Sequence, residues 1–150
     1  MPHPSVSAVP SAFIFPLRIY WEDTDAGGIV FYANYLKFFE RARTEWLRSL
    51  GHGQERLRVD DRMMFVVTDT SLRYLRPARL DDLLDISVDV LDARGASMRI
   101  AQQAWRRSGP AAELLAEGTI RIACVDAGTY RPRRFPSFMT RSAPTGQPPG

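Results

Sequence analysis

The sequence has little cysteine, lysine or histidine and no long apolar run. Cys124 is the only cysteine among 150 residues, which excludes an internal disulfide and is typical of a buried thiol in a reducing compartment. No stretch approaches the roughly 18 uninterrupted apolar residues of a membrane-spanning helix. The first dozen residues lack the charged segment and the apolar run of a signal peptide. We therefore expect a cytoplasmic protein with no membrane span.

The basic residues are almost all arginine. Lysine and arginine together number 20, Lys37 is the only lysine, and the formal net charge is +3. Arginine favours bidentate contact with phosphates and carboxylates. No basic run is interleaved with aromatic residues at the spacing of a nucleic-acid-binding motif, so we expect no nucleic-acid partner. His3 and His52 have no partner at metal-ligand spacing, and the sequence predicts no metal site at either.

The chain is organised around residues 20–51, which combine acids, a glycine pair and the only long helical pattern. In the second half, apolar residues recur at spacings of three and four, which predicts a helix with one buried face. The predicted face comprises Tyr35, Phe39, Ala42, Trp46 and Leu50, widened by Leu36 and Leu47. Asn34 is the expected N-cap and Gly51 the expected C′ residue, so the helix has about 17 residues and a length of about 25 Å.

The first half of this stretch reads as a strand that runs into a loop. Apolar and polar residues alternate up to Trp21, and acids followed by Gly27 and Gly28 then break the alternation. Glycines permit a positive φ and allow a ligand to approach the backbone closely. The helix that follows offers unpaired N–H groups and roughly half a positive charge at its N-terminus. The sequence thus predicts a carboxylate beside an electropositive end of the backbone.

Such a pairing suits acyl transfer. Backbone amides polarise a carbonyl and hold its developing oxyanion, while an aspartate attacks directly or activates water. Two other interpretations fit the same residues. Asp23 and Asp25 can end a strand and cap a turn, or Glu22, Asp23 and Asp25 can supply oxygen ligands to a divalent cation in a phosphohydrolase.

Strand patterns fill the rest of the chain after a polar connection at residues 52–61. Four strands are expected, over residues 63–76, 84–90, 98–105 and 113–126, separated by turns at 93–96 and 106–110. Ile120, Ile122 and Cys124 mark the inner face of the last strand, and Gly118 is a candidate bulge. One long helix and about five strands predict an α+β fold with an antiparallel sheet against the helix. We expect one domain at 13–136, flanked by a disordered arm at 1–12 and a disordered tail at 137–150.

The central stretch also resembles a known family. EDTDAGGIVFYANYLKFFERARTEWLRSLG is similar to the signature of the hotdog-fold acyl-CoA thioesterases, in particular the 4-hydroxybenzoyl-CoA thioesterase group and the Tol-Pal-associated acyl-CoA thioesterases. Further matches in LRYLRPARLDDLLDISVDV, RGAS and ACVDAGTYRPRRFP extend the resemblance from about Leu17 to Pro136. It implies a hotdog sheet around a central helix, thioester hydrolase activity of the EC 3.1.2 class, and a homodimer or homotetramer with sites between subunits. No cofactor is implied, because coenzyme A is part of the substrate.

The resemblance also implies roles for single residues. Asp25 matches the second aspartate of the family's D-x-D-x-x-G run, which is the catalytic carboxylate and acts as nucleophile or general base. Tyr32 matches the position whose backbone N–H, at the helix start, holds the thioester carbonyl. Gly28, Phe31 and Tyr35 are the expected substrate-binding neighbours. Apart from these motif matches, we expect arginines near the RGAS turn or in the RPRR cluster to meet the coenzyme A phosphates, namely Arg94, Arg131, Arg133 or Arg134. Ser97 of the RGAS turn is a further expected substrate-binding residue.

The predicted acyl group follows from two features that disagree. Tyr at position 32 is the hydroxybenzoyl-CoA form of the motif, whereas the Tol-Pal-associated members, which take aliphatic chains, usually have His there. Aromatic contacts of about 0.5–1.5 kcal/mol cannot impose strict selectivity. We therefore expect hydrolysis of both short-to-medium aliphatic and aromatic acyl-CoAs. The alternative is a module that recruits acyl carriers or lipid-synthesis proteins with little turnover.

Overall fold

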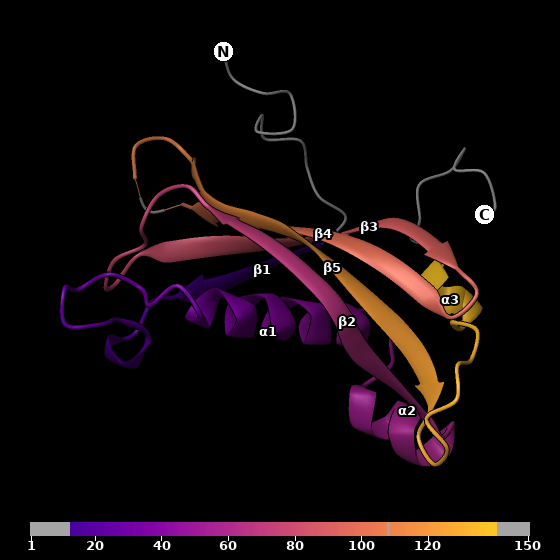
Figure 1. The fold of residues 1–150 in the computed structure, drawn as a ribbon. Helices are drawn as coiled ribbons and strands as arrows, with labels where there is room; N and C mark the ends of the chain where they lie inside the picture. Colours follow the sequence, from indigo (N-terminus) through magenta and orange to yellow (C-terminus); the bar gives the residue numbers. More distant parts are fainter. Residues whose placement is uncertain (1–12, 108, 141–150) are drawn as a thin grey trace.

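The computed structural model describes residues 13–107 and 109–140 and consists of one curved antiparallel sheet around a long helix (Figure 1). The strands are β1 (Phe13–Arg18), β2 (Met63–Tyr74), β3 (Leu83–Arg94), β4 (Ser97–Arg106) and β5 (Glu113–Asp126), in the order β1-β3-β4-β5-β2. Helix α1 (Asn34–Ser49) lies on the concave side of the sheet. The predicted α+β hotdog fold, with five strands and one central helix, is confirmed.

Two short helices lie where the sequence predicted none. Helix α2 (Gln54–Asp60) occupies the predicted polar connection, and its Leu57 is 2% exposed. Helix α3 (Ser137–Thr140) begins the predicted disordered tail, and its Met139 is 1% exposed. A single buried residue in each segment is too little for a periodic pattern, so the sequence did not indicate either helix. The predicted arm at 1–12 and the remainder of the tail lie outside the described residues.

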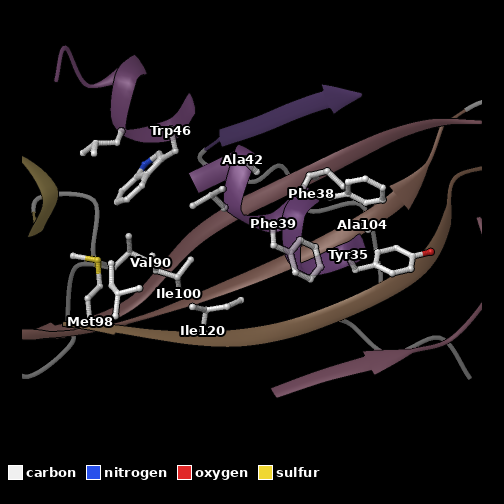
Figure 2. Packing of buried hydrophobic residues seen from close by; sticks show 14 of the residues in the cluster. Tyr35, Phe38, Phe39, Ala42, Trp46, Val90, Met98, Ile100, Ala104 and Ile120 are labelled. Carbon is white, nitrogen blue, oxygen red and sulfur yellow. The ribbon is translucent and has the colours of Figure 1, made fainter. Parts of the chain in front are cut away.

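The apolar face of α1 forms the helical side of the core (Figure 2). Its buried residues are Tyr35, Phe38, Phe39, Ala42, Trp46 and Leu47. They pack on inward side chains of the central strands, including Val90, Met98, Ile100, Ala104 and Ile120. The predicted stripe was wrong at two positions: Phe38 was omitted but is 0% exposed, and Leu36 was included but is 47% exposed. Leu36 lies in the first turn of α1, where it is only partly covered.

A buried polar network joins the helix to the sheet. Gln102 of β4 is 0% exposed. Its Oε1 accepts a hydrogen bond from Arg43 Nη1 of α1 at 2.8 Å, and its Nε2 donates to the Phe39 carbonyl at 3.1 Å and to the Ser87 carbonyl at 3.4 Å. Burial lowers the pKa of the Arg43 guanidinium. Because each polar group of Gln102 is satisfied, the network fixes the position of α1 on the sheet without the cost of an unpaired buried group.

Gly118 does not form the predicted bulge. It pairs in register with Leu72 of β2 and Gln102 of β4, and the extra residue of β5 is Leu115 instead. A Cβ at position 118 would lie 2.3 Å from Leu72 Cδ2 and 2.4 Å from the Ser71 carbonyl oxygen. The glycine is therefore required by the close approach of β2. At the end of α1, Gly51 has φ +93°, which confirms it as the C′ residue.

Within the described residues, no helix is long and apolar enough to cross a membrane.

Candidate active site

The acidic loop is a narrow ladder at the N-terminal end of α1. Asp25 N donates to the Ile29 carbonyl at 2.9 Å, Phe31 N donates to the Asp23 carbonyl at 3.2 Å, and Thr24 and Val30 form the bridge between them. Residues 23–25 therefore run antiparallel to residues 29–31, and the glycines lie in the tip between them. This pairing gives the loop a defined conformation although most of its side chains are exposed.

A second segment, residues 78–82, supports this loop from the sheet side. Val30 N donates to the Ala78 carbonyl at 2.8 Å, and Ile19 exchanges backbone hydrogen bonds with Asp81 and Asp82 at 3.0 and 2.9 Å. These residues belong to the LRPARLDD sequence that precedes β3, far from the loop along the chain. No local pattern in the sequence indicates this contact, because it depends on how β1 and β3 pair.

The two aspartates of the loop have different environments. Asp23 is 9% exposed, and its Oδ2 accepts a hydrogen bond from Tyr20 N at 2.8 Å, which closes the 3₁₀ turn Trp21–Asp23. Asp25 is exposed, and its Oδ1 accepts a hydrogen bond from Gly27 N at 2.8 Å. Asp25 Oδ2 makes no hydrogen bond to any of the described residues. Asp23 therefore holds the loop together, while Asp25 presents a free carboxylate oxygen to solvent.

Gly28 supplies the positive φ that the sequence predicted for this turn. Its φ is +78°, its N–H donates to the Asp25 carbonyl at 3.0 Å, and a Cβ there would meet no atom within 4 Å. The conformation, not a shortage of space, thus requires glycine at this position. The same turn directs the Asp25 carboxylate outward.

The start of α1 differs from the prediction at Asn34. The N-cap is Ala33, which makes no side-chain capping bond, and Asn34 is the first helical residue. Asn34 Nδ2 instead donates to the Asp23 carbonyl at 2.8 Å, so its side chain ties the helix to the acidic loop. The backbone N–H of Tyr32 donates to no acceptor among the described residues. Tyr32 lies three ladder positions from Asp25, which puts the two backbones on the order of 10 Å apart at the usual strand rise.

A shallow hollow opens beside the Asp25 carboxylate. It is lined by Trp21, Thr24, Asp25, Ala26, Gly28 and Leu80. Neither Trp21 nor Leu80 was predicted as a site residue. The alternation up to Trp21 indicated a strand residue, but β1 ends at Arg18 and the 3₁₀ turn leaves the indole 80% exposed.

The predicted aromatic neighbours form a chain of ring contacts that leads into the core. Phe31 and Tyr32 are 47% and 61% exposed, whereas Tyr35 is 3% exposed. Tyr74 of β2, which the sequence did not indicate, connects them, with ring centroids 5.7 Å from Tyr32 and 5.6 Å from Tyr35. Burial raises the pKa of the Tyr35 hydroxyl, and burial followed by the neighbouring Tyr32 raises the pKa of Tyr74.

Arg94 and Ser97 lie at the opposite end of the sheet from Asp25. They pair with each other at the turn between β3 and β4 and line a hollow with Asp92, Arg99 and Arg121. In Figure 1 this turn lies beside α3, whereas the acidic loop lies at the other end of α1. Strand β3 separates the two regions by roughly 35–40 Å at the usual rise per residue. One copy of the chain therefore does not bring Arg94 to Asp25.

The predicted RPRR cluster lies next to the same turn, since Phe135 N donates to the Gly95 carbonyl at 3.0 Å. Arg133 is a structural residue there, because its Nη1 donates to the carbonyls of Asp61 and Arg62 at 2.7 and 3.0 Å. Arg131 and Arg134 are exposed. The described residues contain no group of three or more His, Cys, Asp or Glu side chains arranged to hold a metal ion, and Glu22, Asp23 and Asp25 do not form one.

A curved antiparallel sheet around one central helix defines a protein of the hotdog fold. The chain belongs to the thioesterase-like superfamily, whose sequence profile matches residues 19–142. It is 43% identical over 126 residues to the acyl-CoA thioesterase YbgC of Haemophilus influenzae, covering 84% of this chain and 90% of that protein. It is 41% identical over 127 residues to the acyl-CoA thioester hydrolase YbgC of Escherichia coli O6:H1, covering 85% and 92%.

Among solved structures, the chain resembles that of a probable thioesterase from Bartonella henselae. The TM-score is 0.76 and the sequence identity 34%, and the match covers 83% of this chain and all of the other. The predicted family, the predicted hotdog fold and the predicted enzyme class, a thioester hydrolase, are confirmed.

Proposed function

We propose that this chain hydrolyses acyl-CoA thioesters to a free acid and coenzyme A, with Asp25 as the catalytic carboxylate. The observation that carries the proposal is the contrast between the two loop aspartates. Asp23 uses its carboxylate to close a turn, while Asp25 keeps an oxygen available on the surface. Membership of the thioesterase-like superfamily and 43% identity to an acyl-CoA thioesterase support the class of substrate.

The mechanism needs a carboxylate and an oxyanion donor on the same carbonyl. The Tyr32 N–H is unpaired within the described residues and precedes the first turn of α1, where the helix dipole favours negative charge. A thioester carbonyl between this amide and Asp25 would be polarised by the amide. Asp25 would then attack the carbonyl carbon or remove a proton from a water molecule that attacks it. In the first route the coenzyme A thiolate would leave, and water would then hydrolyse the acyl–Asp25 anhydride to the free acid. In the second route the thiolate would leave from the water adduct and take up the proton that Asp25 removed from the water, which gives the free acid directly.

We propose that the working site combines two copies of the chain. One end of a subunit carries Asp25, Gly28, Phe31 and Tyr32, and the other end carries Arg94 and Ser97. If Arg94 or Ser97 meets the substrate that Asp25 attacks, it must belong to a second copy. Strands β1 and β2 are the two edges of the sheet, and an exposed edge is usually covered by another element or chain. We expect a homodimer or homotetramer by light scattering at micromolar concentration.

Subunit complementation tests that arrangement. Asp25→Asn and Arg94→Ala are each expected to lower activity as pure proteins. Mixing and refolding the two variants should restore up to about a quarter of the wild-type activity. About half of the dimers would then contain one copy of each variant, and one of the two sites in each mixed dimer would have both an intact aspartate and an intact arginine. A fully active monomer, or no recovery in mixed samples of confirmed dimers, would contradict the proposal.

The proposed substrates are short-to-medium aliphatic and aromatic acyl-CoAs. The exposed rings of Phe31 and Tyr32, which lie 4.9 Å apart between centroids, support acceptance of a flat acyl group. Such contacts contribute about 0.5–1.5 kcal/mol, or roughly a two- to tenfold preference. The test is kcat/KM for benzoyl-CoA and hexanoyl-CoA, with release of free thiol as the readout and EDTA as a control for a metal-dependent contaminant. A ratio beyond about a thousandfold in either direction would exclude a permissive enzyme.

A further inference from the structure

Trp21 is the most exposed large apolar side chain of the described residues, at 80% exposure, and Leu80 beside it is 36% exposed. Exposed apolar residues are common, but two that line the same hollow next to a free carboxylate suggest a binding surface. Neither residue contributes to the core cluster. Their positions therefore need an explanation other than stability.

Trp21 and Leu80 are shared by two neighbouring hollows. The first is the hollow beside Asp25, whose other walls are Thr24, Ala26 and Gly28. The second is lined by the same pair together with Arg18, Tyr20, Glu22 and Asp81, none of which lines the first. The two side chains thus form a partition between a hollow that contains the proposed catalytic carboxylate and one that contains three charged residues.

The backbone under this partition is fixed. The Trp21 carbonyl accepts hydrogen bonds from Thr24 N at 3.1 Å and from Thr24 Oγ1 at 2.8 Å. Leu80 stands on a tight turn in which Asp82 N donates to the Arg79 carbonyl at 3.1 Å and Arg79 N donates to Asp82 Oδ2 at 2.9 Å. Side chains on such a rigid base can limit the size of a bound group, because they cannot retreat with the backbone.

We propose that the Trp21–Leu80 partition sets the length of the acyl chain that this enzyme accepts. The proposal rests on the proposed thioesterase function and names the part of the substrate that the hollow takes. The carbons nearest the thioester lie in the hollow beside Asp25, and the chain ends against the indole. A longer chain would have to pass the partition into the hollow of Arg18, Glu22 and Asp81, where charged groups would lose hydration without gaining an apolar contact.

A series of straight acyl-CoAs from four to fourteen carbons tests the partition. In the wild type, kcat/KM rises about fourfold for each methylene that leaves water, until the chain reaches the indole, and then levels off. In Trp21→Ala the plateau moves to chains longer by at least two carbons, and Leu80→Ala produces a smaller shift in the same direction. Trp21→Phe keeps a flat ring and retains the wild-type plateau. Val59→Ala truncates an apolar residue on α2 that is 59% exposed and lies away from both hollows, so its profile matches the wild type.

A binding experiment separates this proposal from the proposed reaction. The Asp25→Asn variant, with and without Trp21→Ala, is titrated with hexanoyl-CoA and with dodecanoyl-CoA by calorimetry. We expect Trp21→Ala to improve the affinity for dodecanoyl-CoA relative to hexanoyl-CoA by at least about tenfold, whether or not the wild type turns the thioesters over. Equal changes for all chain lengths, an unmoved plateau, or equal relative affinities in the two backgrounds would overturn the role of Trp21. Absence of hydrolysis in the wild type, with the affinity shift present, would overturn the reaction alone.

Discussion

The core between α1 and the sheet and the loop of residues 20–31 are stabilised in different ways. In the core, Phe38, Phe39 and Ile100 are at most 1% exposed, and packing of apolar side chains provides the stability. In the loop, Trp21 and Tyr32 are 80% and 61% exposed, and backbone hydrogen bonds define the conformation. The difference shows that side chains on the loop are available for recognition, because the fold does not need to bury them.

This division predicts that substitutions in the two regions will affect different measurements. Truncating a core side chain should lower the free energy of unfolding and leave kcat per folded molecule unchanged. Replacing a loop side chain that makes no structural contact should do the reverse. Asn34 and Asp23 are joined by a hydrogen bond between α1 and the loop. Substitutions at these two residues should therefore change both the free energy of unfolding and kcat, each to a smaller degree.

The largest expected effect is on stability, at the end of α1 far from the loop. Trp46 is 4% exposed and packs against the inner side of the sheet near Val90 and Met98 (Figure 2). Trp46→Ala should lower the free energy of unfolding by about 3–5 kcal/mol, measured by urea denaturation. Leu36→Ala, at an exposed position on the same helix, is the matched control and should cost less than about 0.5 kcal/mol. A loss of kcat in folded Trp46→Ala would show that core and loop are coupled.

The largest effect on catalysis is expected at Asp25. Asp25→Asn keeps the shape of the side chain and its bond from Gly27 N, but removes the charge and the basicity. We expect kcat to fall by at least about 10²-fold, which corresponds to about 2.7 kcal/mol of transition-state stabilisation. The free energy of unfolding should change by less than about 0.5 kcal/mol, since Asp25 is exposed. Full activity in Asp25→Asn, in a protein free of wild-type contamination, would reject the assignment.

The core could be predicted from the sequence better than the loop, because the core is stabilised by apolar packing and the loop by backbone hydrogen bonds. The helix was predicted because apolar residues recur on one face, and Gly51 could be placed because helices commonly end at a glycine. The inner face of β5 was predicted because Ile120, Ile122 and Cys124 alternate, and all three are at most 6% exposed. Periodicity reports burial, so it is informative wherever burial determines the structure.

The loop could be recognised by its motif but not built from its pattern. The orientation of Trp21 depends on a 3₁₀ turn closed by Asp23 and Thr24, and the position of Leu80 depends on backbone bonds between Ile19 and residues 81–82. Neither the 3₁₀ turn nor these backbone bonds produce a periodic pattern of apolar residues in the sequence. Gln102 is an intermediate case. It alternates with Met98 and Ile100 along the predicted strand 98–105, but its partner Arg43 comes from another element.

The Arg43–Gln102 pair allows a test of how polar groups contribute inside the apolar core. Gln102→Leu removes the acceptor of the partly buried Arg43 guanidinium, so we expect a loss of about 1.5–3 kcal/mol of unfolding free energy. Arg43→Met should lower the free energy of unfolding by less, because it removes the charge and leaves Gln102 bonded to the Phe39 carbonyl. The double variant should cost less than the sum of the two single variants by about 1 kcal/mol. Strict additivity in this double-mutant cycle would mean that the hydrogen bond contributes nothing to stability.

The smallest predicted effect concerns Asp23, whose carboxylate stabilises the loop by accepting a hydrogen bond within it. Asp23→Ala removes the acceptor for Tyr20 N, so we expect a loss of about 1 kcal/mol of unfolding free energy. Because the same bond closes the turn that carries Trp21, kcat/KM should also fall, by about threefold to tenfold. Asp23→Asn keeps an oxygen that can accept this bond and should remain within about 0.5 kcal/mol and about threefold of the wild type. Equal losses of activity in Asp23→Asn and Asp25→Asn would mean that the charge of both aspartates matters, and would remove the distinction between a structural and a catalytic aspartate.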